Sequence, residues 1–305
     1  MLTIFTIPKP FTNQHINIIQ RNAIKSWTLL HPACEIILVG NDNGVAKTAQ
    51  EYNIKHIPKV KCNEFNTPLL NSALDLVRQK SKNDILVYVN ADIILLSSFM
   101  NIIKYLPEKE FLVVGQRWDI DIKKLINFNN PDWEKSLRKK IENKGILHPP
   151  SGSDYFVFKK ESFKNLPSFA VGRIDWDNWM IYEARRQKMT TIDATKMHTV
   201  IHQNHDYSHL NGGKKGIFTN PEARRNLKLA KSKKHIFTLK HTNYKLTKSG
   251  LKKKKVGWNL FIEYIKNTPE ILSGNILFWR LLYLLLFVPY KLVKSINERI
   301  VKRII

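Results

Sequence analysis

The residues around Asp92 place a carboxylate directly after an apolar strand. The segment that ends at Val89 is apolar, Asp92 follows it closely, and residues 93–95 are apolar again. An ionised carboxylate flanked in this way is costly unless it is paired or binds a cation. A hard divalent metal with oxygen ligands, Mg²⁺ or Mn²⁺, fits this position. The alternative is that Asp92 caps a helix that begins near residue 97.

A second acidic cluster combines carboxylates with indoles at the predicted start of a helix. Asp175, Trp176, Asp177 and Trp179 lie within five residues. An apolar sugar face can stack on an indole while carboxylates bind its hydroxyl groups, so Trp176 and Trp179 are candidates for acceptor binding. Asp177 would lie in the first helical turn, where the helix dipole lowers the pKa of a carboxyl group. The alternative is that Asp175 caps the helix and both indoles pack in the core.

Two further positions are candidates for ligand contacts. Asp154 follows Gly152 and Ser153 and precedes an aromatic strand, so the small residues predict a flexible, exposed approach for an acceptor. Arg117, after a predicted strand at 111–116, can pair with donor phosphates as a bidentate donor. The alternatives are an ordinary loop-to-strand turn and, for the arginine, a surface ion pair.

The order of these motifs resembles the GT-A class of nucleotide-sugar glycosyltransferases, of the family-2-like type, over roughly residues 1–210. The resemblance implies that Asp92 holds a metal that bridges the diphosphate of the donor. Asn90 stands where the class has a first acidic residue, and it would contribute through its amide oxygen or a water molecule. A histidine near the end of the catalytic domain, His202 or His205, would complete the metal's coordination or contact the diphosphate. The alternative is that both are ordinary loop histidines.

The same resemblance implies a nucleoside pocket at the first two strands. The loop after the first strand usually lines this pocket, and Thr6, Ile7 and Pro8 match it. The loop after the second strand often carries an Asp that contacts the nucleobase or the ribose, and Asp42 matches that position.

The resemblance also implies a general base. In inverting GT-A enzymes an acidic residue at the start of a late helix deprotonates the acceptor hydroxyl as it attacks the anomeric carbon. Asp177 is the first choice for this role and Asp175 the second. Asp154 lies where a strand of the class helps to shape the acceptor side.

The elements that must position these residues alternate along the chain. Apolar, β-branched runs predict strands at 2–7, 35–39, 54–57, 84–90 and 111–116, and helical spacing predicts helices at 14–30, 45–53 and 68–80. This order predicts an α/β fold, GT-A-like and Rossmann-like, with a mostly parallel sheet flanked by helices. In such sheets ligands bind at the carboxyl ends of the strands. The sequence lacks the glycine-rich phosphate loops of dinucleotide dehydrogenases and P-loop enzymes, which disfavours both classes.

The positive charge is concentrated at one end of the chain. The 305 residues hold 50 Lys and Arg against 25 Asp and Glu, a net charge of +25. Residues 210–305 contribute 22 of these basic residues and 4 of the acidic ones. We therefore predict a catalytic domain at 1–210 and a basic, helical extension at 211–305. Aromatic residues are sparse over residues 212–256, which are dense in Lys and Arg, and this disfavours nucleic acid as a partner.

An apolar run at 276–290, interrupted by Arg280 and Pro289, lies in this extension. It is short for a membrane span, whereas an amphipathic helix among basic residues is typical of an anionic membrane surface. The alternative is a helix packed on the globular domain or on a second subunit. Two cysteines are too few for a disulfide framework, which indicates a reducing compartment. Together with the basic amphipathic segment, this predicts a cytoplasmic protein peripheral to the inner face of a membrane.

The sequence thus favours a metal-assisted glycosyltransferase. It would transfer a sugar from a nucleoside-diphosphate-sugar donor to a hydroxyl group of a glycan or a lipid-linked acceptor, with inversion. The alternatives are a nucleotidyltransferase and a non-catalytic basic protein, bound to membrane or nucleic acid, with a transferase-like domain.

Overall fold

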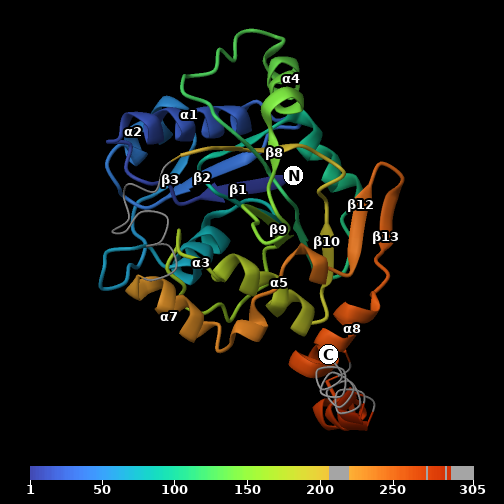
Figure 1. The fold of residues 1–305 in the computed structure, drawn as a ribbon. Helices are drawn as coiled ribbons and strands as arrows, with labels where there is room; N and C mark the ends of the chain where they lie inside the picture. Colours follow the sequence, from blue (N-terminus) through green and yellow to red (C-terminus); the bar gives the residue numbers. More distant parts are fainter. Residues whose placement is uncertain (206–219, 273, 286, 290–305) are drawn as a thin grey trace, which may run out of the picture. The chain divides into compact units, whose positions relative to one another are not determined.

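The structure is a computed structural model that describes residues 1–205, 220–272, 274–285 and 287–289 (Figure 1). The chain divides into two compact units, Met1–Lys254 and Lys255–Ile305. The domain boundary predicted at 210 falls within 206–219, outside the described residues. Part of the predicted extension, residues 221–253, forms elements of the first unit, as given below.

A nine-stranded sheet forms the centre of the first unit. Its order is β13-β12-β10-β6-β9-β4-β1-β2-β3. The strands are β1 (Leu2–Thr6), β2 (Glu35–Val39), β3 (Lys55–Ile57), β4 (Ile85–Val89), β6 (Phe111–Val114), β9 (Tyr155–Lys159), β10 (Thr190–Asp193), β12 (Tyr244–Thr247) and β13 (Gly250–Lys253). Only β9 and β13 run antiparallel to their neighbours among these described strands. The predicted α/β fold with a mostly parallel sheet is confirmed.

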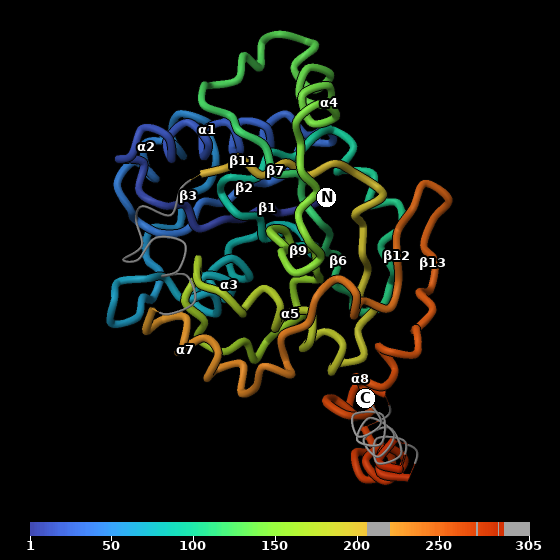
Figure 2. The backbone as a smooth tube through the Cα atoms, in the orientation of Figure 1, coloured from blue at the N-terminus to red at the C-terminus, as the bar shows by residue number. Residues whose placement is uncertain are grey.

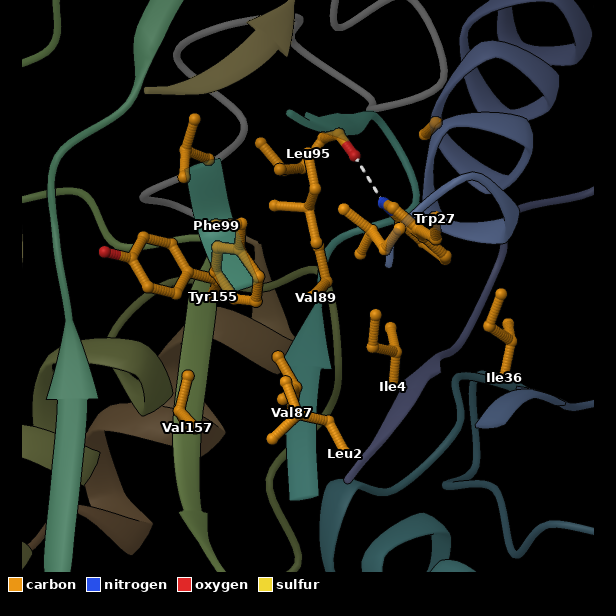
Figure 3. Packing of buried hydrophobic residues seen from close by; sticks show 14 of the residues in the cluster. Leu2, Ile4, Trp27, Ile36, Val87, Val89, Leu95, Phe99, Tyr155 and Val157 are labelled. Carbon is orange, nitrogen blue, oxygen red and sulfur yellow. Dashed lines mark hydrogen bonds between the residues drawn. The ribbon is translucent and has the colours of Figure 1, made fainter. Parts of the chain in front are cut away.

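Apolar side chains project from both faces of this sheet, which explains the nearly continuous apolar runs of its strands. Ile4 of β1 belongs to the same buried cluster as Trp27, whose Nε1 donates to the Ile93 carbonyl at 2.9 Å (Figure 3). The next residue, Phe5, faces the other way and contacts the Tyr88 ring at 5.4 Å between centroids. Each face must therefore be covered by helices.

The helices of the first unit cover both faces (Figures 1 and 2). Figure 2 shows the α1 and α2 segments on one side of the sheet and α3, α5 and α7 on the other. The bounds are α1 (Gln14–Thr28), α2 (Val45–Glu51), α3 (Leu70–Lys80), α4 (Trp133–Lys144), α5 (Trp176–Arg186) and α7 (Pro221–Leu229), with 3₁₀ helices η1 (Ser97–Tyr105), η2 (Lys233–His235) and η3 (Leu239–His241). Helix α1 begins after Asn13, whose side chain accepts from the Ile16 amide at 3.0 Å.

A second, four-stranded sheet lies in the same unit, with the order β5-β11-β7-β8. Its strands are β5 (Ile93–Leu95), β7 (Trp118–Ile120), β8 (Ile146–Leu147) and β11 (Val200–Gln203). In this register His202 lies opposite Ile93 on one side and opposite Asp119 on the other. The small sheet thus brings Ile93, the residue after Asp92, beside the polar residues His202 and Asp119.

The second unit contains α8 (Trp258–Asn267), the 3₁₀ helix η4 (Pro269–Ile271) and a helix over residues 276–285. In the part of the chain that the structure describes, no helix combines the length and apolar character needed to cross a membrane.

Candidate active site

The loop that carries Asp92 joins β4 to β5 and is held by hydrogen bonds from a buried glutamine, Gln203. The backbone N–H of Gln203 donates to the Asp92 carbonyl at 3.2 Å, and its side-chain Nε2 donates to the same oxygen at 3.1 Å. Gln203 Nε2 also reaches the Ile19 carbonyl of α1, and Gln203 Oε1 accepts from Asn22 Nδ2 at 3.0 Å. Since Gln203 is fully buried, this network fixes the backbone at Asp92 against α1.

Asp92, His202 and His205 form a compact cluster. Asp92 Oδ2 lies 3.2 Å from His205 Nε2 and 3.8 Å from His202 Nε2. One ligand atom from each residue can be chosen so that all three lie within 4.8 Å of one another. These three residues are among the metal ligands predicted from the sequence, and the structure brings them together.

The electrostatics of Asp92 favour its ionised form. Burial alone would raise the pKa of its carboxyl group, but the His205 hydrogen bond and the charges of His202, His205 and Lys9 lower that pKa well below its usual range. Asp92 Oδ1 is buried and has no hydrogen-bond partner among the described residues. A buried carboxylate oxygen without a partner next to two imidazoles suits a divalent cation. Lys9, in the loop after β1, was not named as a site residue from the sequence.

A second carboxylate orients one of these imidazoles. Asp119 Oδ1 lies 3.0 Å from His202 Nδ1, and Asp119 Oδ2 lies 2.7 Å from His148 Nδ1. This contact places the His202 ring between two carboxylates, with Asp119 on the Nδ1 side and Asp92 on the Nε2 side. Burial raises the pKa of Asp119, yet His148, His202 and Arg117 lower it far more. Sequence reasoning missed Asp119 and His148, and the only local signal was a carboxylate between the apolar residues Trp118 and Ile120.

Arg117 links this carboxylate to the next one. Its Nε donates to Asp119 Oδ1 at 2.9 Å, and its guanidinium forms an ion pair with Asp154. Burial lowers the pKa of Arg117, but Asp154 and Asp119 raise it above its usual value. Arg117 was predicted to bind donor phosphates, whereas the structure pairs it with two carboxylates.

Asp154 is tied to the end of β4. Its backbone carbonyl accepts from the Asn90 amide at 2.9 Å, and its Oδ1 accepts from Asn90 Nδ2 at 2.6 Å. Asn90, predicted as a metal ligand, therefore directs its amide group to Asp154. The exposed approach expected at Ser153 is wrong, because Ser153 and Asp154 are both buried.

Asp177 lies in the first turn of α5, as predicted, but its electrostatics are opposite to the prediction. The pKa of Asp177 is raised to about 7, first by burial and then by the nearby Asp154 and Asp175, although its own backbone amide and that of Asn178 favour the charged form. Desolvation and like charges here outweigh the dipole of a short helix. A carboxyl group with this pKa can take up a proton near neutral pH.

Asp175 precedes α5 in a strained conformation. Its φ of 81° lies in the left-handed region, which residues other than glycine rarely adopt. In the described structure its side chain makes no capping hydrogen bond, so the expected side-chain cap is wrong, although its carbonyl accepts from the Trp179 amide at 2.9 Å. Burial raises the pKa of Asp175.

The two indoles of the cluster lie in the core. Trp176 packs against Tyr88 and Phe156, with ring centroids 5.1 and 5.3 Å apart, and Trp179 packs against Phe169 at 5.1 Å. Both are buried, as in the alternative of core packing, so neither presents a free face for a sugar.

The residues predicted to bind the nucleoside lie at the carboxyl ends of the adjacent parallel strands β1 and β2. Thr6 and Pro8 are buried and Ile7 is half-buried. The Thr6 hydroxyl has no hydrogen-bond partner within the described ranges. Asp42 is half-buried, and burial raises its pKa. These positions and Asp92 share one edge of the sheet, because β1, β2 and β4 are parallel.

No family model matches this chain, and no curated protein matches it. The chain is similar to solved structures of glucosyl-3-phosphoglycerate synthase from Mycobacterium tuberculosis. One of these, with Mn²⁺, uridine diphosphate and phosphoglyceric acid, shows 14% identity and a TM-score of 0.45, covering 76% of this chain and 79% of that chain. Another, with Mg²⁺ and uridine diphosphate, shows 13% identity and a TM-score of 0.45, covering 76% and 80%.

A mannosyltransferase from Pyrobaculum calidifontis, in complex with GDP-Man and Mn²⁺, is also similar, with 12% identity and a TM-score of 0.40, covering 66% of this chain and 56% of that chain.

Proposed function

We propose that this chain is a glycosyltransferase that uses a divalent metal and a nucleoside-diphosphate-sugar donor. The observation that carries the proposal is the cluster of Asp92, His202 and His205 at the carboxyl ends of parallel strands. In α/β sheets this edge is where nucleotide ligands bind. The similar solved structures that hold uridine diphosphate or GDP-Man with Mn²⁺ or Mg²⁺ agree with the proposal.

The donor set fits Mn²⁺ or Mg²⁺. Asp92 offers one oxygen beside two imidazoles and a second, buried oxygen without a partner among the described residues. Asp92, His202 and His205 would hold the metal, and the metal would neutralise charge that develops on the leaving diphosphate. Asp119 would keep the His202 ring in the orientation that presents Nε2 to this cluster.

Asp177 would serve as the general base. With a pKa of about 7 its carboxylate can accept the proton of the acceptor hydroxyl as the oxygen attacks the anomeric carbon. The bond between the anomeric carbon and the diphosphate breaks as the new one forms, which inverts the configuration. The acceptor we propose is a hydroxyl group of a glycan or of a lipid-linked sugar.

The test compares Asp92→Asn with Asp84→Asn. Both changes remove one carboxylate charge, but Asp84 is exposed at the opposite, amino-terminal end of β4. The Asp92 variant should lose Mn²⁺-dependent hydrolysis of sugar nucleotides and Mn²⁺ binding, measured by paramagnetic resonance, while the Asp84 variant keeps both. Equal activity in the two variants would overturn the metal site. Stoichiometric release of pyrophosphate instead of a nucleoside diphosphate would indicate a nucleotidyltransferase.

A further inference from the structure

The helix over residues 276–285 in the second unit has two apolar faces that differ in what covers them. One face packs against α8 through rings. The Phe261 and Trp279 rings lie 6.2 Å apart between centroids, and the Trp258 and Phe287 rings lie 5.8 Å apart. Tyr283 stacks on Phe287 at 5.5 Å. This face is therefore the internal core of the second unit.

The other face of the same helix is apolar and exposed. The exposed residues are Leu277, Phe278, Leu281, Leu284, Leu285 and Val288, which we call the leucine stripe; their exposed fractions range from 36% to 73%. Leu281, Leu284, Leu285 and Val288 follow Leu277 by 4, 7, 8 and 11 residues. These spacings place side chains on one side of an α-helix. A continuous apolar stripe is normally removed from water by a partner.

The charge of the second unit restricts what that partner can be. Residues 255–305 hold eight Lys and Arg against three Glu, and Lys252–Lys255 lead directly into α8. A second copy of this chain would bring the same positive charge against the first. An anionic lipid surface offers both an apolar layer for the stripe and negative head groups for the basic residues.

The depth of insertion is set by the helix itself. The apolar run at 276–290 is interrupted by Arg280 and Pro289 and is shorter than the about 20 apolar residues that a bilayer span requires. Arg280 is exposed on the same helix, and an arginine at this place can extend to phosphate groups while the leucines enter the acyl layer. We propose that the leucine stripe docks the protein on an anionic membrane surface, lying in the plane of the interface.

The experiment uses the full chain and sedimentation with vesicles. Vesicles of phosphatidylcholine mixed with phosphatidylglycerol are compared with vesicles of phosphatidylcholine alone. Leu285→Glu and Leu281→Glu test the stripe, and Leu125→Glu is the matched control, because Leu285 is 73% exposed and Leu125, in the first unit, is 61% exposed. All three variants change the charge equally, and circular dichroism checks that each one folds.

The proposal predicts that the natural chain binds the mixed vesicles and that Leu285→Glu or Leu281→Glu lowers the affinity about tenfold or more. Leu125→Glu should bind like the natural chain, and high salt should weaken binding. Equal binding by all variants would overturn the proposal. A concentration-dependent dimer in light scattering that the stripe variants abolish, without vesicle binding, would assign the stripe to a second copy instead.

Discussion

Asp119 of β7 lies opposite His202 of β11, and its Oδ1 comes within 3.0 Å of His202 Nδ1. This contact links the cluster of Asp92, His202 and His205 to Arg117 and His148, which share the same carboxylate. The second sheet therefore has a direct role in the site, because its register places these two side chains together.

Replacing Asp119 by Asn should weaken metal binding without removing a ligand. The neutral amide loses the ionic contact with His202 Nδ1, and it leaves the charge of Arg117 less compensated near the cluster. We expect the Mn²⁺ affinity to fall about 10- to 100-fold, which paramagnetic resonance can measure. Asp132→Asn is the control, since Asp132 is exposed and makes no side-chain cap in the described α4. An unchanged affinity in Asp119→Asn would contradict the orienting role.

The rate of sugar transfer should depend on pH through Asp177. Only the carboxylate form can accept a proton, and the pKa of Asp177 is about 7. We therefore expect the rate to rise about tenfold per pH unit below that value and to level off above it. Asp177→Asn should lose transfer while retaining Mn²⁺ binding. The same rising pH profile in an active Asp177→Asn variant would exclude this residue as the base.

Stability should respond to the same group. In the folded protein the pKa of Asp177 is about 7, raised from the usual value of 3.8. Between these two values the folded state binds more protons, so the carboxyl group destabilises the protein progressively as pH rises. Asp177→Asn should therefore raise the midpoint of thermal unfolding at pH 8 relative to the natural chain, with a smaller difference at pH 4. A difference that is independent of pH would show that the Asp177 carboxyl group is not desolvated in the folded state.

Asp92 could be predicted from a local sequence pattern, whereas His202 and His205 were predicted through the resemblance to GT-A glycosyltransferases. The apolar run before Asn90 predicts a strand end, and parallel strands bring their carboxyl ends to one edge, so Asp92 could be placed there. Asp119 and Gln203 were missed because they act through the pairing of β7 with β11, and three- or four-residue strands far apart in the chain leave little periodic signal. The expected pKa of Asp177 was wrong since burial and the proximity of Asp154 arise only in the folded chain.

Gln203 should be more important for stability than its polarity suggests. Gln203→Leu removes the side-chain hydrogen bonds to the Asp92 carbonyl, to the Ile19 carbonyl and from Asn22, all of them at a fully buried position. We expect the free energy of unfolding to fall by about 2–4 kcal/mol, measured by urea denaturation. Gln50→Leu, at an exposed position of α2, should change it by less than about 0.5 kcal/mol. Similar losses in both variants would remove the special role of Gln203.

Position 115 must be glycine because a buried hydroxyl group leaves no room for a Cβ atom, and not because of its backbone angles. A Cβ atom at this position would overlap the Tyr155 hydroxyl, which is hydrogen-bonded to His198 Nε2 at 2.9 Å. Both rings are buried, so neither can move aside without disturbing the core. Gly115→Ala should destabilise the protein by about 1–3 kcal/mol. Gly257→Ala is the control, because no described atom lies within 4 Å of its added Cβ.

The overlap with Tyr155 can be separated from any backbone effect by a double-mutant cycle. Tyr155→Phe removes the hydroxyl oxygen that the new Cβ would meet, at the cost of the hydrogen bond to His198. In the Tyr155→Phe background Gly115→Ala should therefore cost less free energy of unfolding than it does in the natural chain, and the two changes should not be additive. Full additivity, measured by urea denaturation of the four proteins, would place the origin of the cost in the backbone at residue 115 instead of in the hydroxyl group.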